Sequence, residues 1–385
     1  MKKRLPLILL TVAGFTFNTS ELMPIGLLSD IADDFGVTEA RAGLIISVYA
    51  WMVALLSLPL TLWFARMDFR RLMLWVVGIF AVSHLGSVLS TSYWQLMASR
   101  IGVAAAHSVF WSIAPSMAVA VSPGHQRATA LSAMVAGGGI ALIAGLPLGR
   151  VLGLVAGWRV TFGVLGVLAA LLFFGLRASL PPLPQAADGE SRGSILRHVV
   201  TCRPLLMIYL ITAVIVTGHY TGYSYIEPFM YRVVGMPEQT ITLTLALFGV
   251  AGLIGSWVTS RYFPRHPRSL ITISCFGLPA MLLLLLPVSA AGLAPLALLC
   301  IAWGMAMTVY NISFQNEIIL FAPSHSAVAM SIYSGIFNLG IGSGAFVGGF
   351  VCDAGLMPHI GYIGGLISLS AAIYALFRFI PRMKI

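Results

Sequence analysis

The segment from Phe15 to Gly26 reads FTFNTSELMPIG and lies inside the first long apolar run of the chain. A helix over this run would place Glu21 at membrane depth. A carboxylate there is costly unless it faces protein or water, so it commonly marks an ion or substrate pathway. The alternative is that Glu21 lies near the outer surface and is solvated. Asn18 shares its helix face, and Pro24 predicts a weakened helix with backbone groups free for other partners.

The composition is that of an integral membrane protein. Of the 385 residues, 59% are hydrophobic and 9% are charged, whereas soluble domains carry about 25% charged residues. The net charge of +10 lies mostly in short loops, which membrane topology explains better than a nucleic-acid-binding surface. Four scattered cysteines lack metal-ligand spacing, so we expect no metal, no cofactor and no disulfide framework.

Twelve apolar runs are each long enough to cross about 30 Å of hydrocarbon as a helix. They fall at roughly 5–28, 40–65, 72–90, 94–121, 128–155, 158–177, 205–231, 240–262, 269–289, 293–320, 326–351 and 359–380. The pattern predicts an all-α membrane protein with twelve transmembrane helices. An even number of spans places both chain ends on the same side.

The lysines and arginines outside these runs are distributed unevenly. With the N-terminus inside, seventeen of them lie in inside segments, and only Arg41, Arg159 and Arg232 lie outside. The positive-inside rule therefore predicts that both termini are cytoplasmic.

The longest polar interruption, residues 179–204, is rich in proline, glycine and charge, as is typical of a linker. It separates residues 1–178 from residues 205–385. Spans five and eleven echo each other, reading AGGGIALIAGLPLG at 136–149 and GIFNLGIGSGAFVGG at 335–349. Glycines at such spacing let membrane helices pack closely, and their equivalent placement predicts two six-helix pseudo-symmetric bundles arranged as a parallel repeat.

Span four carries a polar stripe formed by Arg100, Ala104, His107 and Trp111, spaced four, three and four residues apart. Either Arg100 or His107 could pair with Glu21, because buried charges need partners. Arg100 could instead extend to the outer surface. His107 fits a proton carrier or a hydrogen-bonding group for a solute, and it equally fits a packing residue.

Span seven combines aromatic and polar groups. His219, Tyr223 and Glu227 are four residues apart on one face, and Tyr220 flanks them. Tyrosines near a membrane boundary often form an aromatic belt, which is the alternative interpretation. A histidine and a glutamate aligned with them favour a cavity for a small polar ligand such as a sugar.

Spans ten and eleven add two amides, Asn311 and Asn338, deep enough to need partners in protein or in a wet cavity. Glu317 lies near the inner end of span ten, where we expect a solvated cap or loop contact. No phosphate-binding G-x-x-x-x-G-K-[ST] segment and no Ser/His/Asp arrangement stands out, which argues against direct ATP use and against an enzyme.

Several motifs together resemble the major facilitator superfamily over the whole chain. Within it they are most similar to the drug–proton antiporter branch and to bacterial sugar efflux transporters of the arabinose and isopropyl-thiogalactoside exporting type. The motifs are NTSELMPIGLLSDIA (18–32), YAW (49–51), SRIGVAAAH (99–107), GLPLGR (145–150), GWRVTF (157–162), HYTGYSYIEPF (219–229) and SGIFNLGIG (334–342).

The resemblance assigns roles to individual residues. It implies that Arg100 is the proton-coupling arginine and Glu21 its titrating partner, with Asp30 as a further proton-coupling candidate. The remaining residues, implied to act in gating or packing, are Arg70, Arg71, Gly145, Pro147 and Gly149. The cytoplasmic loop departs from the family pattern, because only the paired arginines and a displaced Asp68 remain there.

Together these observations predict a proton-coupled antiporter that exports small sugars or sugar-like solutes, with drugs or nucleosides as the alternative substrates. We expect a monomer in the bacterial inner membrane whose partners are the solute, protons and the lipid bilayer, and no nucleic acid. The expected substrate-binding residues are Asn18, Glu21, His107, Trp111, His219, Tyr220, Tyr223, Glu227, Asn311 and Asn338.

Overall fold

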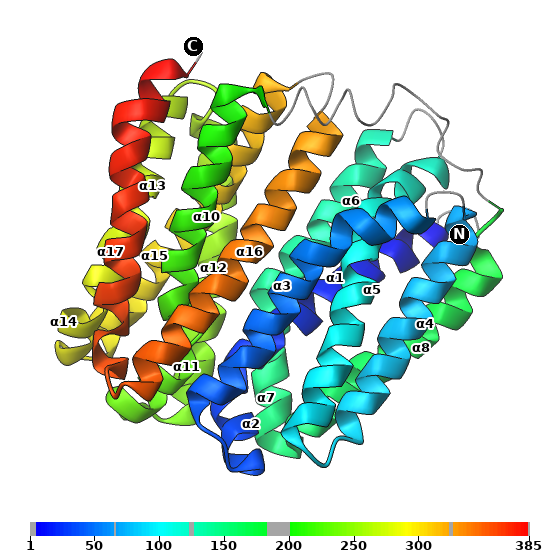
Figure 1. Cartoon of the computed structure of the whole chain (residues 1–385), viewed down its shortest axis with the longest axis horizontal. Helices are drawn as coiled ribbons and strands as arrows, with labels where there is room; N and C mark the ends of the chain where they lie inside the picture. Colours follow the sequence, from blue (N-terminus) through cyan, green and yellow to red (C-terminus); the bar gives the residue numbers. More distant parts are fainter. Residues whose placement is uncertain (1–4, 65–66, 123–126, 183–200, 323–325, 384–385) are drawn as a thin grey trace. The chain divides into compact units, whose positions relative to one another are not determined.

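The computed structural model describes residues 5–64, 67–122, 127–182, 201–322 and 326–383, and every regular element in these ranges is helical (Figure 1). The chain folds into two compact units. Unit 1 comprises residues 1–37 and 48–187, and unit 2 comprises residues 38–47 and 188–385.

The first unit is built from nine helical segments within the described residues. They are α1 (Leu5–Gly26), α2 (Leu28–Phe35), α3 (Glu39–Trp63), α4 (Phe69–Val88), α5 (Tyr93–Ala120), α6 (Arg127–Ile140), the π-helical η4 (Ala141–Gly145), α7 (Leu146–Ala156) and α8 (Trp158–Ser179). The first nine residues of α3 belong to unit 2.

Unit 2 is also helical throughout its described regular elements, and several of its helices are divided into shorter segments. The helical segments are α10 (Arg203–Tyr223), α11 (Ile226–Pro228), η5 (Phe229–Val233), α12 (Glu238–Tyr262), α13 (Pro267–Leu283), α14 (Leu285–Ala290), α15 (Leu293–Phe321), α16 (Ser326–Asp353), η7 (Met357–His359), α17 (Ile360–Tyr374), η8 (Ala375–Phe379) and η9 (Ile380–Arg382).

The described residues contain ten helices that are long and apolar enough to cross a membrane, which confirms a multi-pass membrane protein. Two of the predicted spans are not among these ten, because the structure breaks them. The run at 128–155 is interrupted by the π-helical turn η4 and resumes with Pro147 at the start of α7. The run at 269–289 breaks at Leu284, and Pro287 follows in the first turn of α14, where a missing N–H is tolerated. The count of twelve therefore stays a prediction.

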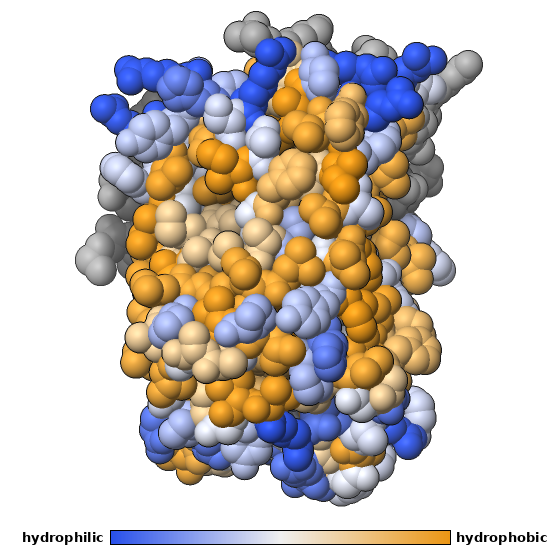
Figure 2. Space-filling model, turned by 90° about the vertical axis from the view of Figure 1, so that its left-hand side faces the viewer, coloured by the Kyte–Doolittle hydropathy of each residue, from blue (hydrophilic) through white to orange (hydrophobic). Residues whose placement is uncertain are grey.

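Much of the predicted linker, residues 183–200, lies outside the described residues. On the face drawn in Figure 2, hydrophobic residues form a broad band and hydrophilic residues gather at both ends. Exposed apolar side chains such as Trp257 and Phe377 belong to this type of surface, at 61% and 71% exposure. Such large exposed apolar groups fit a protein whose solvent is lipid.

Closely packed glycines join helices within each unit, as the paired Gly-rich segments predict. In unit 1 a Cβ at Gly145 would lie 2.6 Å from Thr19 Oγ1 of α1. In unit 2 a Cβ at Gly344 of α16 would overlap the carbonyl oxygen of Thr217 in α10. Span five thus packs on span one, and span eleven packs on span seven, with no room for a side chain at either contact.

The paired arginines at the start of α4 take part in local structure. Asp68 caps α4, because its Oδ1 accepts a hydrogen bond of 2.9 Å from the Arg71 amide. The Arg70 guanidinium donates to the carbonyl oxygen of Arg177 at the end of α8, at 2.8 Å. The gating role implied for these arginines by the resemblance stays a prediction.

Candidate functional site

Glu21 of α1 meets His107 of α5 inside unit 1. Their Oε2 and Nε2 atoms are 3.6 Å apart, and the side chains are 17% and 5% exposed. The His107 ring lies edge-on to Tyr49, with centroids 5.8 Å apart, and 6.0 Å from the ring of Phe17. The carboxylate therefore lies largely inside protein, beside an imidazole and among aromatic rings.

Arg100 of α5 is buried inside unit 1 and does not extend to the surface, since only 1% of it is exposed. Its guanidinium donates to Ser20 Oγ at 3.1 Å and to the Ser20 carbonyl oxygen at 3.0 Å. It also lies 4.5 Å from the ring centroid of Tyr49 and 5.6 Å from that of Phe162, distances at which a cation is attracted to an aromatic ring. Of the two candidates for a Glu21 partner, the structure brings His107 to that position.

The sequence interpretation missed two residues that complete this cluster, Ser20 and His84. Ser20 Oγ lies 3.0 Å from His84 Nε2 of α4, and His84 is fully buried. The His84 ring packs edge-on against Phe80, with centroids 4.5 Å apart. The sequence signal that could have identified His84 is its place as a lone histidine in the apolar run at 72–90.

Asn18 and Trp111 approach each other at Gly138 of α6. A Cβ at Gly138 would lie 2.9 Å from Asn18 Nδ2 and 3.6 Å from the Trp111 ring. Both side chains are partly buried. Asp30 lies in the first turn of α2, beyond the end of α1. Asn18 and Trp111 thus meet at one point of α6, whereas Asp30 belongs to a different element.

A second cluster lies within unit 2, around His219 of α10. Trp303 Nε1 of α15 donates a hydrogen bond of 2.9 Å to His219 Nδ1. The imidazole stacks on Tyr223, with centroids 5.2 Å apart, and meets Tyr220 edge-on at 4.8 Å. Tyr223 in turn packs against Phe248 of α12 at 4.8 Å. The sequence interpretation did not assign Trp303 or Phe248 to the site.

The burial of this cluster argues against an aromatic belt. His219, Tyr220 and Tyr223 are 1%, 7% and 9% exposed, whereas belt residues face the membrane interface. Because Trp303 can only donate, His219 Nδ1 must be the acceptor, which fixes a neutral imidazole protonated at Nε2.

The two amides predicted to bind substrate, Asn311 and Asn338, occupy different settings. Asn311 Oδ1 accepts from the Tyr333 hydroxyl and from Gln315 Nε2, each at 3.0 Å. Asn338 Nδ2 donates to the Ser334 carbonyl oxygen at 3.0 Å. Its Oδ1 is buried without a hydrogen-bond partner among the described residues. An acceptor left in this way has capacity for a polar ligand.

Two glutamates of unit 2 that the sequence analysis singled out, Glu227 and Glu317, are both buried. Glu227 lies in the short helix α11 and is 1% exposed. Glu317 is also 1% exposed, so the expectation of a solvated cap or loop contact was wrong. The physical reason is that α15 continues to Phe321, which leaves Glu317 a full turn inside the helix.

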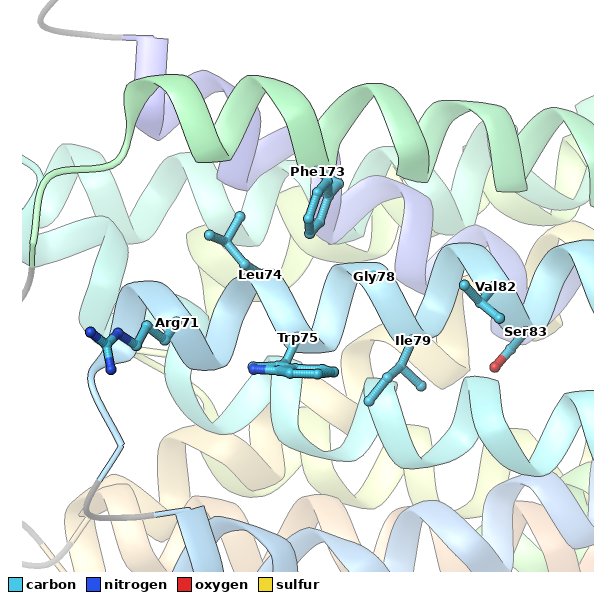
Figure 3. A pocket seen from close by; sticks show the side chains of 8 residues that line it. All are labelled: Arg71, Leu74, Trp75, Gly78, Ile79, Val82, Ser83 and Phe173. Carbon is cyan, nitrogen blue, oxygen red and sulfur yellow. The ribbon is translucent and has the colours of Figure 1, made fainter.

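A separate groove of about 530 Å³ lies along α4 and α8 of unit 1 (Figure 3). It is lined by Arg71, Leu74, Trp75, Gly78, Ile79, Val82, Ser83 and Phe173. Its walls are apolar, and Trp75 and Val82 are 65% and 69% exposed. It contains none of the predicted substrate-binding residues, so the buried polar clusters remain the candidate site. Among the described residues no three metal-ligating side chains gather.

The model of the Major Facilitator Superfamily matches residues 8–327. The chain belongs to this superfamily. Three solved transporters have similar folds. A bacterial homologue of the human lysosomal transporter Spinster, in an inward-facing and unoccupied conformation, has a TM-score of 0.73 and 18% identity, over 98% of this chain and 93% of its own. The nucleoside transporter NupG has a TM-score of 0.79 and 15% identity, over 97% and 100%.

A peptide-bound transporter of the POT family also resembles this superfamily member. Its TM-score is 0.78 and its identity 11%, over 96% of this chain and 95% of its own. Identities this low support the fold alone. Family and fold together identify a membrane transporter, which in general is not an enzyme.

Proposed function

We propose that this transporter is a proton-coupled antiporter that exports small sugars or sugar-like solutes by alternating access. The observation that carries the proposal is the Glu21–His107 pair, a carboxylate and an imidazole 3.6 Å apart inside unit 1. A carboxylate within a membrane span that faces other protein groups is a characteristic proton site in transporters. Protonation at such a site biases which conformation is populated.

The cluster around His219 in unit 2 is the proposed solute site. It offers aromatic faces from Tyr223 and Trp303 beside one imidazole, and Asn338 adds an open acceptor elsewhere in the unit. Aromatic walls with a few placed polar groups are the usual composition of a small-ligand site. Within unit 2, Glu227 is a further proposed contact. In unit 1, Asn18 and Trp111 stay predicted substrate-binding residues.

One observation favours the alternative substrates, nucleosides or drugs. The cluster around His219 contains four aromatic side chains, Tyr220, Tyr223, Phe248 and Trp303. The centroids of neighbouring rings in it lie within 6 Å of each other. Such a ring-rich cluster suits a planar apolar group better than a small sugar.

We further propose that the protein is a monomer in a bacterial inner membrane with both termini cytoplasmic.

A counterflow assay in proteoliposomes tests substrate class and transport together. Vesicles holding the protein are loaded with unlabelled solute and diluted into labelled sugar, nucleoside or drug. The proposal expects labelled sugar to accumulate transiently. Uptake of only the nucleoside or the drug would favour these alternative substrates over sugars. No uptake of any of the three classes would contradict the proposed solute transport.

A further inference from the structure

The proline of α1 explains why Arg100 binds where it does. In a regular α-helix the carbonyl oxygen of Ser20 would accept a hydrogen bond from the amide of residue 24. Residue 24 is proline and has no amide hydrogen, so the Ser20 carbonyl lacks its usual donor within the helix. Arg100 supplies the missing donor at 3.0 Å. The proline thus creates the acceptor that the arginine uses.

The side chains extend this contact from Arg100 to His84. Arginine has no acceptor, so Arg100 donates to Ser20 Oγ at 3.1 Å. Ser20 Oγ also lies 3.0 Å from His84 Nε2. A serine hydroxyl has one hydrogen and two acceptor lone pairs, so Ser20 donates to this nitrogen in one neutral tautomer of His84 and accepts from it in the other. His84 Nδ1 is buried without a hydrogen-bond partner among the described residues.

The groups around His84 come from three other helices. Ser20 reaches it from α1, Arg100 from α5 is the charged group in this cluster, and α8 contributes the Phe162 ring at 5.9 Å and the backbone at Gly166. On its own helix α4 the neighbour is Phe80. Either neutral tautomer of His84 can therefore bond Ser20, whereas a second proton on the imidazole would place a second cation in the cluster that holds Arg100.

We propose that Pro24, Ser20 and His84 form a clamp that holds the Arg100 guanidinium away from the Glu21 carboxylate. These three are positioning residues, and the proposal rests on the proton-coupling role of Glu21 proposed above. While the clamp holds, Arg100 satisfies its charge with Ser20 and the Tyr49 ring, and Glu21 faces His107. Releasing the clamp frees the guanidinium to approach the neighbouring carboxylate and to stabilise its charged form.

Four variants of the full chain in liposomes test the clamp through the pH profile of gradient-driven transport. His84→Gln keeps a hydrogen-bonding partner for Ser20 but cannot titrate, so its profile should match the wild type. His84→Phe removes this partner, and Pro24→Ala returns an amide that competes for the Ser20 carbonyl. Both should move the profile to lower pH by about one unit, the effect of a tenfold change in proton affinity. Pro279→Ala, at another buried proline within a helix, should leave it unchanged.

A second readout requires no transport. Nitrogen-15 NMR of labelled histidine reports the hydrogen bonding of each ring nitrogen, and the His84→Gln variant assigns the signal. The clamp expects a neutral His84 at neutral pH and a shifted Nε2 resonance in Ser20→Ala. An Nε2 resonance that does not move in Ser20→Ala, or a wild-type pH profile in His84→Phe, overturns the clamp. If neither the wild type nor any variant transports solute, the proton-coupling function proposed above fails. The NMR result then decides alone whether the clamp exists.

Discussion

At the scale of single residues, the position of Glu21 decides how the proposed antiporter uses protons. The carboxylate is 17% exposed, so it is largely removed from water yet open enough for a proton to reach. It faces the His107 imidazole, while the buried guanidinium of Arg100 is bound to Ser20. This separation means that the charge of Glu21 is not neutralised by a fixed ion pair with the arginine.

Glu21→Gln copies the protonated carboxylate at nearly the same shape. We expect this variant to keep counterflow of the solute, which needs no net proton movement, and to lose accumulation driven by a pH difference. Both are measured in the same proteoliposomes, with Glu238→Gln at the start of α12 as the control. If Glu21→Gln still accumulates solute against its gradient, Glu21 is not the coupling residue, and His107 or Asp30 takes its place.

Removing the Arg100 guanidinium should move the pH profile of transport in the opposite direction to releasing it from the clamp. Arg100→Ala takes away the positive charge near Glu21, which makes the charged carboxylate less favourable. The pH profile of gradient-driven transport should therefore move to higher pH by about one unit. A profile that moves to lower pH, or does not move, contradicts an electrostatic influence of Arg100 on the proton site.

The proposed solute site can be tested through the stacked pair His219 and Tyr223 in unit 2. Tyr223→Ala and His219→Ala each remove a ring from the cluster around Trp303. We expect each to weaken solute binding more than tenfold, equal to about 1.4 kcal/mol. Equilibrium binding to purified protein measures this, and Tyr231→Ala, at an exposed tyrosine of η5, is the control. Unchanged binding in both ring variants would assign the cluster to packing.

At the scale of helices, tight glycine contacts set how closely neighbours approach. A Cβ at Gly344 would overlap the Thr217 carbonyl oxygen, whereas one at Gly335 of the same helix meets nothing within 4 Å. Gly344→Ala should therefore destabilise the protein by about 1–3 kcal/mol, the usual effect of overpacking. Gly335→Ala should be neutral or stabilising, because alanine is the better helix former. Thermal unfolding in detergent compares the two, and equal midpoints would contradict the contact.

Hydrophobic runs predicted the helices well, because a membrane helix must be apolar along its whole length. The break at η4 was not predicted, since a π-helical turn leaves no pattern in hydropathy. Glu21 was found because a carboxylate in an apolar run is conspicuous. Its surroundings were harder to predict: Ser20 and His84 lie 64 residues apart in the chain, and their hydrogen bond depends on how α1 and α4 pack. The ring of Phe248 gives no polar signal at all.

At the scale of the whole chain, the two units share one packing rule. In unit 1 the Gly-rich segment of span five covers α1, which carries Glu21. In unit 2 the Gly-rich helix α16 covers α10, which carries His219. The equivalent helices of each unit thus hold the proposed proton and solute groups. This correspondence supports the parallel repeat that the sequence predicts, and a repeat of six spans requires both termini on one side.

Reporter fusions test this topology directly. Seventeen lysines and arginines fall on the proposed inside and three on the outside, so the positive-inside rule predicts cytoplasmic termini. Fusions after Leu180 and after Met383 should report the cytoplasm, and a fusion after Asp34 should report the periplasm. Each position carries both an alkaline phosphatase and a fluorescent reporter, because the two are active on opposite sides of the membrane. A periplasmic signal after Leu180 would leave an odd number of spans before the linker, and it would contradict the six-span repeat and the equivalence between α1 and α10.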